Sequence, residues 1–166
     1  MMIAPPAALV SLFGPWAGFY GDSLLTQTLV TFAHVGGLVV GGGIAIASDR
    51  MTLRLSSDVE RRRHLLDVAQ LHRTVIVALM TIMLSGALLF AADVEAYWAS
   101  WIYWVKMALV ALLLANGARM RRIEAATATE PLVTAAHWSV FRGTAVASLT
   151  LWLAVTLAGV ALLNYA

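Results

Sequence analysis

The chain has 166 residues, of which 61% are apolar and 12% charged, and it contains no cysteine. Such a composition is typical of an integral membrane protein, and the lack of cysteine excludes disulfides and thiolate metal sites. The formal charge of +2 conceals a strong pattern, because eight of the eleven basic residues lie in two short segments. Clusters of this kind mark cytoplasmic loops rather than a nucleic-acid surface, so no nucleic acid is expected as a partner. The two segments contain Arg50, Arg54, Arg61, Arg62 and Arg63, and then Arg119, Arg121 and Arg122.

Residues 1–22 are expected to lie in the outer interface of the membrane, since they combine prolines and glycines with Trp16, Phe19 and Tyr20. They lack the basic start of a cleaved signal peptide. The first span is predicted over 24–48, because residues 23–48 carry no charged side chain and about 20 apolar residues cross a bilayer core of ~30 Å. Further spans are predicted over 66–92, 97–120 and 133–164.

These spans predict an all-α fold, an integral membrane four-helix bundle that forms one domain over 1–166. Both basic segments then face the cytoplasm, and both termini lie outside it. The acidic connection Asp93–Glu95 also lies outside, next to an aromatic belt at the start of the third span. The belt consists of Tyr97, Trp98, Trp101, Tyr103 and Trp104. His64, which follows three arginines, is expected to be solvated and without a special role.

The central candidate residue is His34, because an imidazole near mid-membrane is costly and therefore a functional candidate. At about 100° per residue, Gly37 and Gly41 fall on roughly the same side of the helix as His34. The groove that they form admits either a neighbouring helix, the usual role of membrane glycines, or a flat ligand such as a porphyrin. A purely structural histidine would need only a hydrogen-bond partner, for which Thr31 and Gln27 are the nearest candidates.

A second ionisable residue, Lys106, is predicted at the same depth as His34, since each lies about ten residues from the outer end of its span. Lys106 is expected to face the bundle interior and to pair with another group, because an unpaired ammonium in hydrocarbon costs several kcal/mol. Arg73 is equally compatible with snorkelling to the inner interface, and an interfacial role is favoured for His137. The second, inner tier of polar residues comprises His72, Arg73, His137 and Arg142.

Three methionines, Met80, Met83 and Met107, are predicted at about the level of His34. Thioethers are soft ligands suited to Cu(I). Methionine is also an ordinary filler of irregular gaps, which is the favoured interpretation here.

Three short patterns resemble a known group of membrane proteins. His34, the run Gly41-Gly42-Gly43 and Arg50, sixteen residues after the histidine, are similar to the first helix of HemJ-type protoporphyrinogen oxidases. The stretch from Trp104 through Lys106 to Leu112 is similar to their third helix, and Ser85-Gly86 is similar to a feature of CopD-type copper-resistance domains. The chain therefore resembles the CopD/HemJ-like group of small four-helix bacterial membrane proteins. That resemblance implies a multi-pass protein of the bacterial inner (cytoplasmic) membrane, with His34 and Lys106 as the functional pair and haem b as the cofactor.

Three functional hypotheses follow. The first is a membrane b-type haem protein that acts in electron transfer or in oxidation of a hydrophobic substrate; if it is an enzyme, it is a haem-dependent oxidoreductase of the HemJ type. Arginines would meet the propionates, and His72 or Lys106 would oppose His34 at the iron. The second is copper binding or transport through His34, Met80, Met83 and Met107. The third is a non-catalytic accessory or scaffold subunit whose glycine face binds another membrane protein or a second copy. The cofactor-binding set of the first hypothesis is His34, Gly37, Gly41, His72, Arg73, Lys106, His137 and Arg142, with His34 and His72 as metal ligands.

Overall fold

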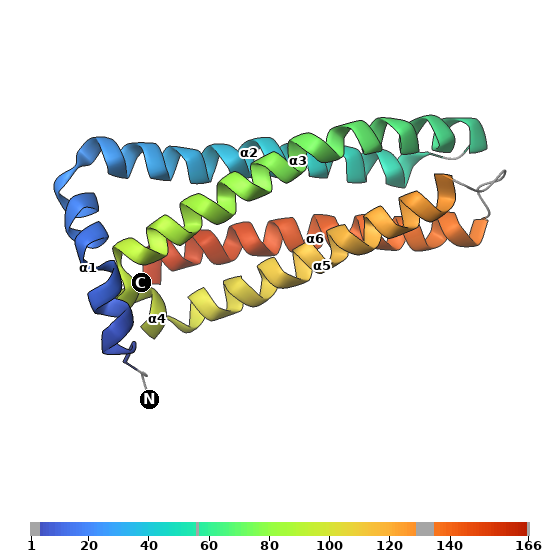
Figure 1. Cartoon of the computed structure of the whole chain (residues 1–166). Helices are drawn as coiled ribbons and strands as arrows, with labels where there is room; N and C mark the ends of the chain where they lie inside the picture. Colours follow the sequence, from blue (N-terminus) through green and yellow to red (C-terminus); the bar gives the residue numbers. More distant parts are fainter. Residues whose placement is uncertain (1–3, 56, 129–134, 166) are drawn as a thin grey trace.

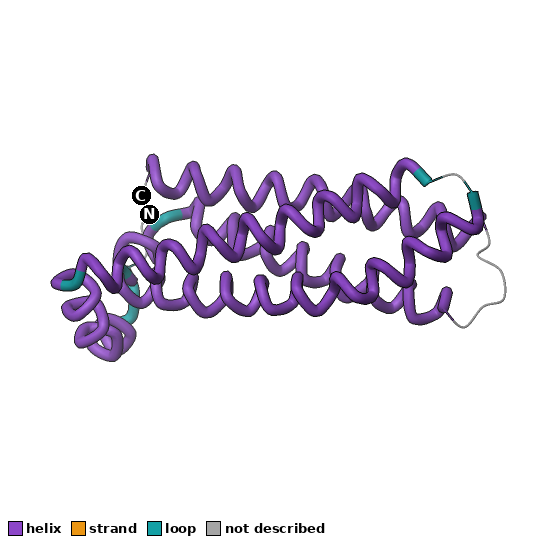
Figure 2. The backbone as a smooth tube through the Cα atoms, turned by 90° about the horizontal axis from the view of Figure 1, so that it is seen from above, coloured by secondary structure: helices purple, strands orange, loops and turns teal. Residues whose placement is uncertain are grey.

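The computed structural model describes residues 4–55, 57–128 and 135–165, and in this part of the chain every regular element is an α-helix. Four long helices lie side by side, and a shorter one, α1, crosses one end of the bundle (Figure 1). Seen from above, the long helices run the length of the molecule and the loops lie only at its ends (Figure 2). The helices are α1 Ala7–Asp22, α2 Leu24–Arg54, α3 Asp58–Ala92, α4 Val94–Ala99, α5 Trp101–Ala128 and α6 Ala135–Tyr165.

Four of these helices are long and apolar enough to cross a membrane, as the sequence predicts. The apolar stretches are Leu24–Arg54, Arg73–Ala92, Trp101–Ala126 and Trp138–Asn164. Large apolar side chains on their outer faces are exposed, for example Phe32, Leu157 and Leu163. An apolar surface of this extent suits contact with lipid rather than water.

The helix boundaries differ from the predicted spans at the basic end. The first long helix continues to Arg54, six residues past the predicted end of its span, and α3 begins at Asp58, close to the helix start expected near Val59 and before the predicted span at residue 66. The side chain of Ser57 accepts a hydrogen bond from the backbone N–H of Glu60 at 3.3 Å and so caps the start of α3. Charged residues remain helical beyond the apolar core, because their side chains there are outside the hydrocarbon. A hydrophobicity pattern therefore detects the span but not the whole helix.

The third span also starts differently from the prediction. A separate short helix, α4, ends before Ser100, and α5 begins at Trp101 rather than at residue 97. The indole N–H of Trp104 donates to the backbone carbonyl of Trp98 at 3.0 Å and joins the two helices. Part of the predicted aromatic belt is thus a small packed corner, not one continuous helix.

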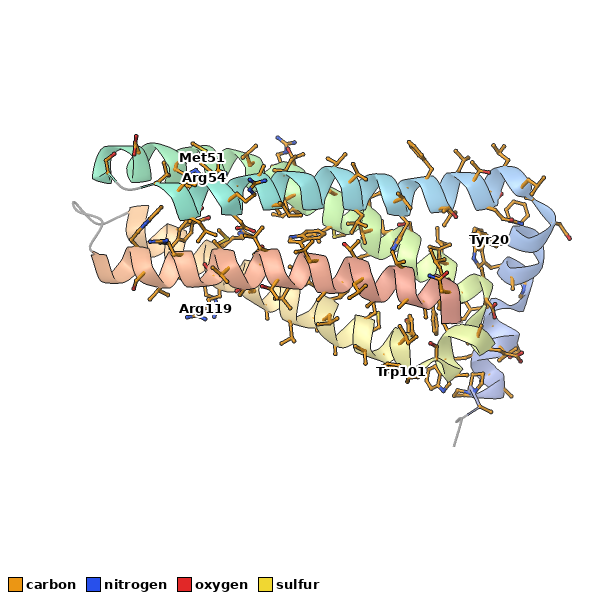
Figure 3. The ribbon with its side chains drawn as sticks, turned by 180° about the vertical axis from the view of Figure 1, so that it is seen from behind. Tyr20, Met51, Arg54, Trp101 and Arg119 are labelled. Atoms are coloured by element: carbon orange, nitrogen blue, oxygen red, sulfur yellow. The ribbon has the colours of Figure 1, made fainter. Side chains whose placement is uncertain are left out.

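Aromatic and basic residues occupy opposite ends of the bundle. Figure 3 shows Tyr20 and Trp101 toward one end and Arg54 and Arg119 toward the other. Both termini lie at the aromatic end (Figure 1). There the indole N–H of Trp16 donates to the carbonyl of Leu88 at 2.9 Å, which fastens α1 to the end of α3.

The four long helices pack as two pairs. Most interhelical contacts join α2 to α3 and α5 to α6, and α2 also packs along α6. The best-buried apolar side chains of the described residues lie on α6, where Phe141, Ala145 and Trp152 are at most 4% exposed. Because α6 packs along both α5 and α2, it joins the two pairs, and α3 also contacts α5.

Candidate functional site

His34 is half-buried on α2 and is held against α3. Its Nδ1 lies 3.1 Å from the carbonyl oxygen of Ile82 and 3.1 Å from Oγ of Ser85. The Ser85 hydroxyl already donates to the carbonyl of Thr81 at 2.6 Å, so it accepts from His34. Since a carbonyl oxygen can only accept, Nδ1 must carry the ring proton. In a neutral ring, Nε2 then keeps its lone pair, which is free to bind a proton or a metal.

This hydrogen bonding differs from the prediction that Thr31 or Gln27 would be the partner of a structural histidine. The amide of Gln27 instead donates to the carbonyls of Tyr20 and Gly21, at 3.0 Å each. The partners of His34 lie 48 and 51 residues away in sequence. They belong to a neighbouring helix, which only the folded bundle brings close.

A glycine makes room for the imidazole. A Cβ placed on Gly86 would lie 3.2 Å from Cε1 of His34, closer than nearly all such contacts. A side chain at this position would require the imidazole to shift by a few tenths of an ångström. The Ser85-Gly86 pair, noted for its resemblance to CopD-type domains, thus supplies both a hydrogen bond and space.

Lys106 of α5 reaches the same interior region from the other helix pair. Its Nζ lies 3.8 Å from the position that a Cβ would take on Gly159 of α6. Its ammonium is also near enough to His34 for the two groups to interact electrostatically. Each polar side chain thus lies against a glycine, and α2, α3, α5 and α6 all contribute to the site. His34 and Lys106, which the sequence placed at one depth, are thus close enough to interact electrostatically.

Replacing Lys106 tests how much its buried charge lowers the stability of the bundle. We expect Lys106→Met to raise the stability of the bundle by roughly 2–3 kcal/mol, because a thioether of similar length needs no hydration in an apolar interior. The midpoint of chemical unfolding in mild detergent measures this change. Lys106→Arg, which keeps the charge, serves as the control and should give no such gain. A loss of stability in Lys106→Met would instead mean that the ammonium makes a strongly favourable pairing.

The glycine groove beside His34 is filled by protein. A Cβ on Gly37 would lie 2.8 Å from Cγ1 of Ile82, and one on Gly41 would lie 2.7 Å from Cβ of Ala78. The structure corrects the expectation that these glycines line a porphyrin, because α3 occupies the space. It also covers the face that the scaffold hypothesis assigned to another membrane protein. Here the glycines allow close helix packing, the alternative considered for them.

The inner tier of predicted residues does not form a described site. Arg73 and Arg142 are exposed, as expected for side chains that reach the membrane surface. The side chains of His72 and His137 lie outside the described residues. Hence the predicted propionate contacts and the predicted second histidine ligand stay predictions.

Two members of the alternative copper set, Met80 and Met83, are exposed side chains of α3. Met80 is 57% exposed and Met83 is 41% exposed. The side of α3 that contacts α2 is marked by Ala78 and Ile82, and at about 100° per residue Met80 lies on the opposite side. Among the described residues there is also no group of three or more histidines and carboxylates that could hold a metal ion.

The burial of two polar side chains, His64 and Asp49, was not predicted from the sequence. His64 was expected to be solvated, but it is 3% exposed and its Nε2 lies 2.7 Å from Oγ1 of Thr52. That expectation is wrong because α2 and α3 continue past the apolar core and pack on each other there. Asp49 is 2% exposed and is hydrogen-bonded to Ser148 of α6. Its burial could have been suspected from the sequence, because Asp49 follows Gly42 by seven residues and so lies on the same face of α2. That face packs against Trp152 of α6.

Fold and site together define a class: a multi-pass helical membrane protein with a His–Lys pair inside the bundle. No family model matches the chain, and neither does any curated protein or solved structure. The resemblance to CopD/HemJ-like proteins therefore stays a prediction from three short patterns.

Proposed function

We propose that this chain is a protein of the bacterial cytoplasmic membrane that holds a b-type haem through Nε2 of His34. Its function would be electron transfer or oxidation of a hydrophobic substrate. The observation that carries the proposal is the hydrogen bond from Nδ1 of His34 to the Ile82 carbonyl. Metal-ligating histidines usually donate their other ring N–H to such a group, which fixes the tautomer and the ring orientation.

The donor atom fits a haem, but the predicted groove does not. Because α3 fills the glycine side of His34, Gly37 and Gly41 would not hold a macrocycle, and His34 would hold the haem through Nε2 alone. Bound haem iron supplies reversible one-electron chemistry whose potential depends on the axial ligand and the surroundings. Lys106 would hold a positive charge near that centre, which favours the reduced state of the iron and raises the potential.

The absorption spectrum of the protein purified in mild detergent tests the proposal. Cells should be supplied with a haem precursor, so that haem supply does not limit occupancy. A Soret band with about one haem per chain is the expected result. A protein that has neither a Soret band nor affinity for added haemin would refute the proposal, and bound copper without haem would favour the copper hypothesis.

We further propose that the basic end of the bundle faces the cytoplasm, because arginines gather there. The chain has no native cysteine, so a maleimide will label only the single cysteine that is introduced. We expect Glu95→Cys to react with a membrane-impermeant maleimide in intact cells, and Ser57→Cys to react only after the membrane is opened. Both positions are exposed. Equal labelling of both variants from outside would contradict this orientation.

A further inference from the structure

A cavity of about 240 Å³ lies between all four long helices, away from His34 and toward the basic end. Most of its wall is apolar, with side chains such as Leu79, Leu113 and Trp152. Drug-sized pockets usually measure roughly 300–1,000 Å³, so this cavity suits a smaller molecule. Its polar lining comes chiefly from Ser48 and Asp49 of α2, Ser148 of α6 and Arg121 of α5.

Two oxygen atoms beside this cavity lack partners. Oδ2 of Asp49 and Oγ of Ser48 are both buried and form no hydrogen bond. The carboxyl group of Asp49 is hydrogen-bonded to Ser148. A buried carboxylate without a full set of partners is costly, by several kcal/mol for an unpaired ion. A ligand that brings positive charge and several hydrogen-bond donors would remove this cost.

Arg121 also lines the cavity, but its positive charge interacts with Glu124 rather than with Asp49. Arg121 is exposed at the cavity wall, and Glu124, three residues further along α5, is near enough to interact with it electrostatically. Residues at this spacing are neighbours on a helix surface. The charge of Arg121 is therefore offset on its own helix, whereas the partner that the described residues give Asp49 is the neutral side chain of Ser148.

We infer that the cavity at Asp49 binds a small organic ammonium ion with an apolar body. An ammonium group has three N–H donors, which match the oxygens of Asp49, Ser48 and Ser148. The apolar wall, which includes Trp152, takes the hydrocarbon part of the ligand. The site is separate from His34 and does not depend on the proposed haem.

The test uses n-hexylammonium chloride as the probe and the full chain in mild detergent at pH 7.5. Saturable binding is followed by isothermal titration calorimetry. n-Hexanol has the same apolar body without the charge, and sodium chloride controls for ionic strength. We expect hexylammonium to bind and Asp49→Asn, which keeps the shape but removes the charge, to weaken binding at least tenfold, about 1.4 kcal/mol. Asp22→Asn, at the exposed end of α1, is the matched control and should bind as the parent does.

Several results would overturn the inference. These are the absence of hexylammonium binding, equal binding of hexanol, and unchanged affinity in Asp49→Asn. Binding of sodium ions alone, lost in Asp49→Asn, would assign the site to an inorganic cation instead. If Asp49→Asn does not fold, Ser148→Ala removes one of the three oxygens, and an unchanged affinity in that variant would count equally against the inference.

Discussion

His34→Ala is expected to yield a folded protein that retains no stoichiometric haem. The substitution removes Nε2, the only atom that we assign as an axial ligand from α2, so occupancy should fall from about one haem per chain to near zero. The methyl group of alanine also leaves the hydrogen-bond acceptors of α3 in place. Pyridine haemochrome analysis gives the occupancy, and far-ultraviolet circular dichroism shows whether the helices remain.

Ser85→Ala is the matched control for this experiment. It removes one of the two acceptors of Nδ1 but leaves the carbonyl of Ile82. We therefore expect Ser85→Ala to keep its haem, with at most a small shift in potential. Full haem occupancy in His34→Ala would show that the iron is held elsewhere, and the proposed function would lose its central residue.

Gly41→Leu should separate α2 from α3. Even a Cβ at this position would lie 2.7 Å from that of Ala78, so the two helices must move apart before a leucine fits. Overpacking of this kind typically costs 1–3 kcal/mol, and we expect about 3 kcal/mol here because backbone has to move. The free energy of unfolding in mild detergent, obtained by chemical denaturation, measures the loss.

Gly43→Leu provides a control two residues away on the same helix. No atom lies within 4 Å of a Cβ at Gly43, and the residue is exposed. Its stability should stay within about 1 kcal/mol of the parent, the range of helix propensity. Equal destabilisation of both variants would mean that any leucine in this glycine cluster is harmful, and that close contact with α3 is not the cause.

Much of the fold follows from one-dimensional features of the sequence. Apolar runs of sufficient length identify four spanning helices, and the arginine clusters separate one end from the other. Depth along the predicted spans put His34 and Lys106 at one level; the two groups interact electrostatically, although α5 begins only at Trp101. These features depend on distance along a helix, which follows directly from the number of residues.

The partners of each side chain could not be predicted in this way. Gly37 and Gly41 gave a clear stripe, yet a stripe does not say whether a helix or a ligand fills it. The burial of His64 required knowing that α2 and α3 stay in contact beyond the membrane core. Asp49 appeared only as the first charge after an apolar run, and its burial depends on Ser148, almost one hundred residues away. Such contacts arise from rotation of helices about their axes, which the sequence pattern leaves open.

His34 lies on the α2–α3 pair and Lys106 on the α5–α6 pair, so the distance between them depends on how the two pairs are tilted. The energy between two polar groups changes with their separation, most steeply in a medium of low dielectric constant. Spanning helices adjust their tilt when the hydrocarbon layer becomes thicker or thinner. If the α2–α3 pair tilts against the α5–α6 pair, the imidazole and the ammonium move relative to each other while each stays fixed to its own glycine. The thickness of the surrounding bilayer would then set the electric field at the imidazole, and the lipid composition of the membrane would tune the chemistry of the bundle.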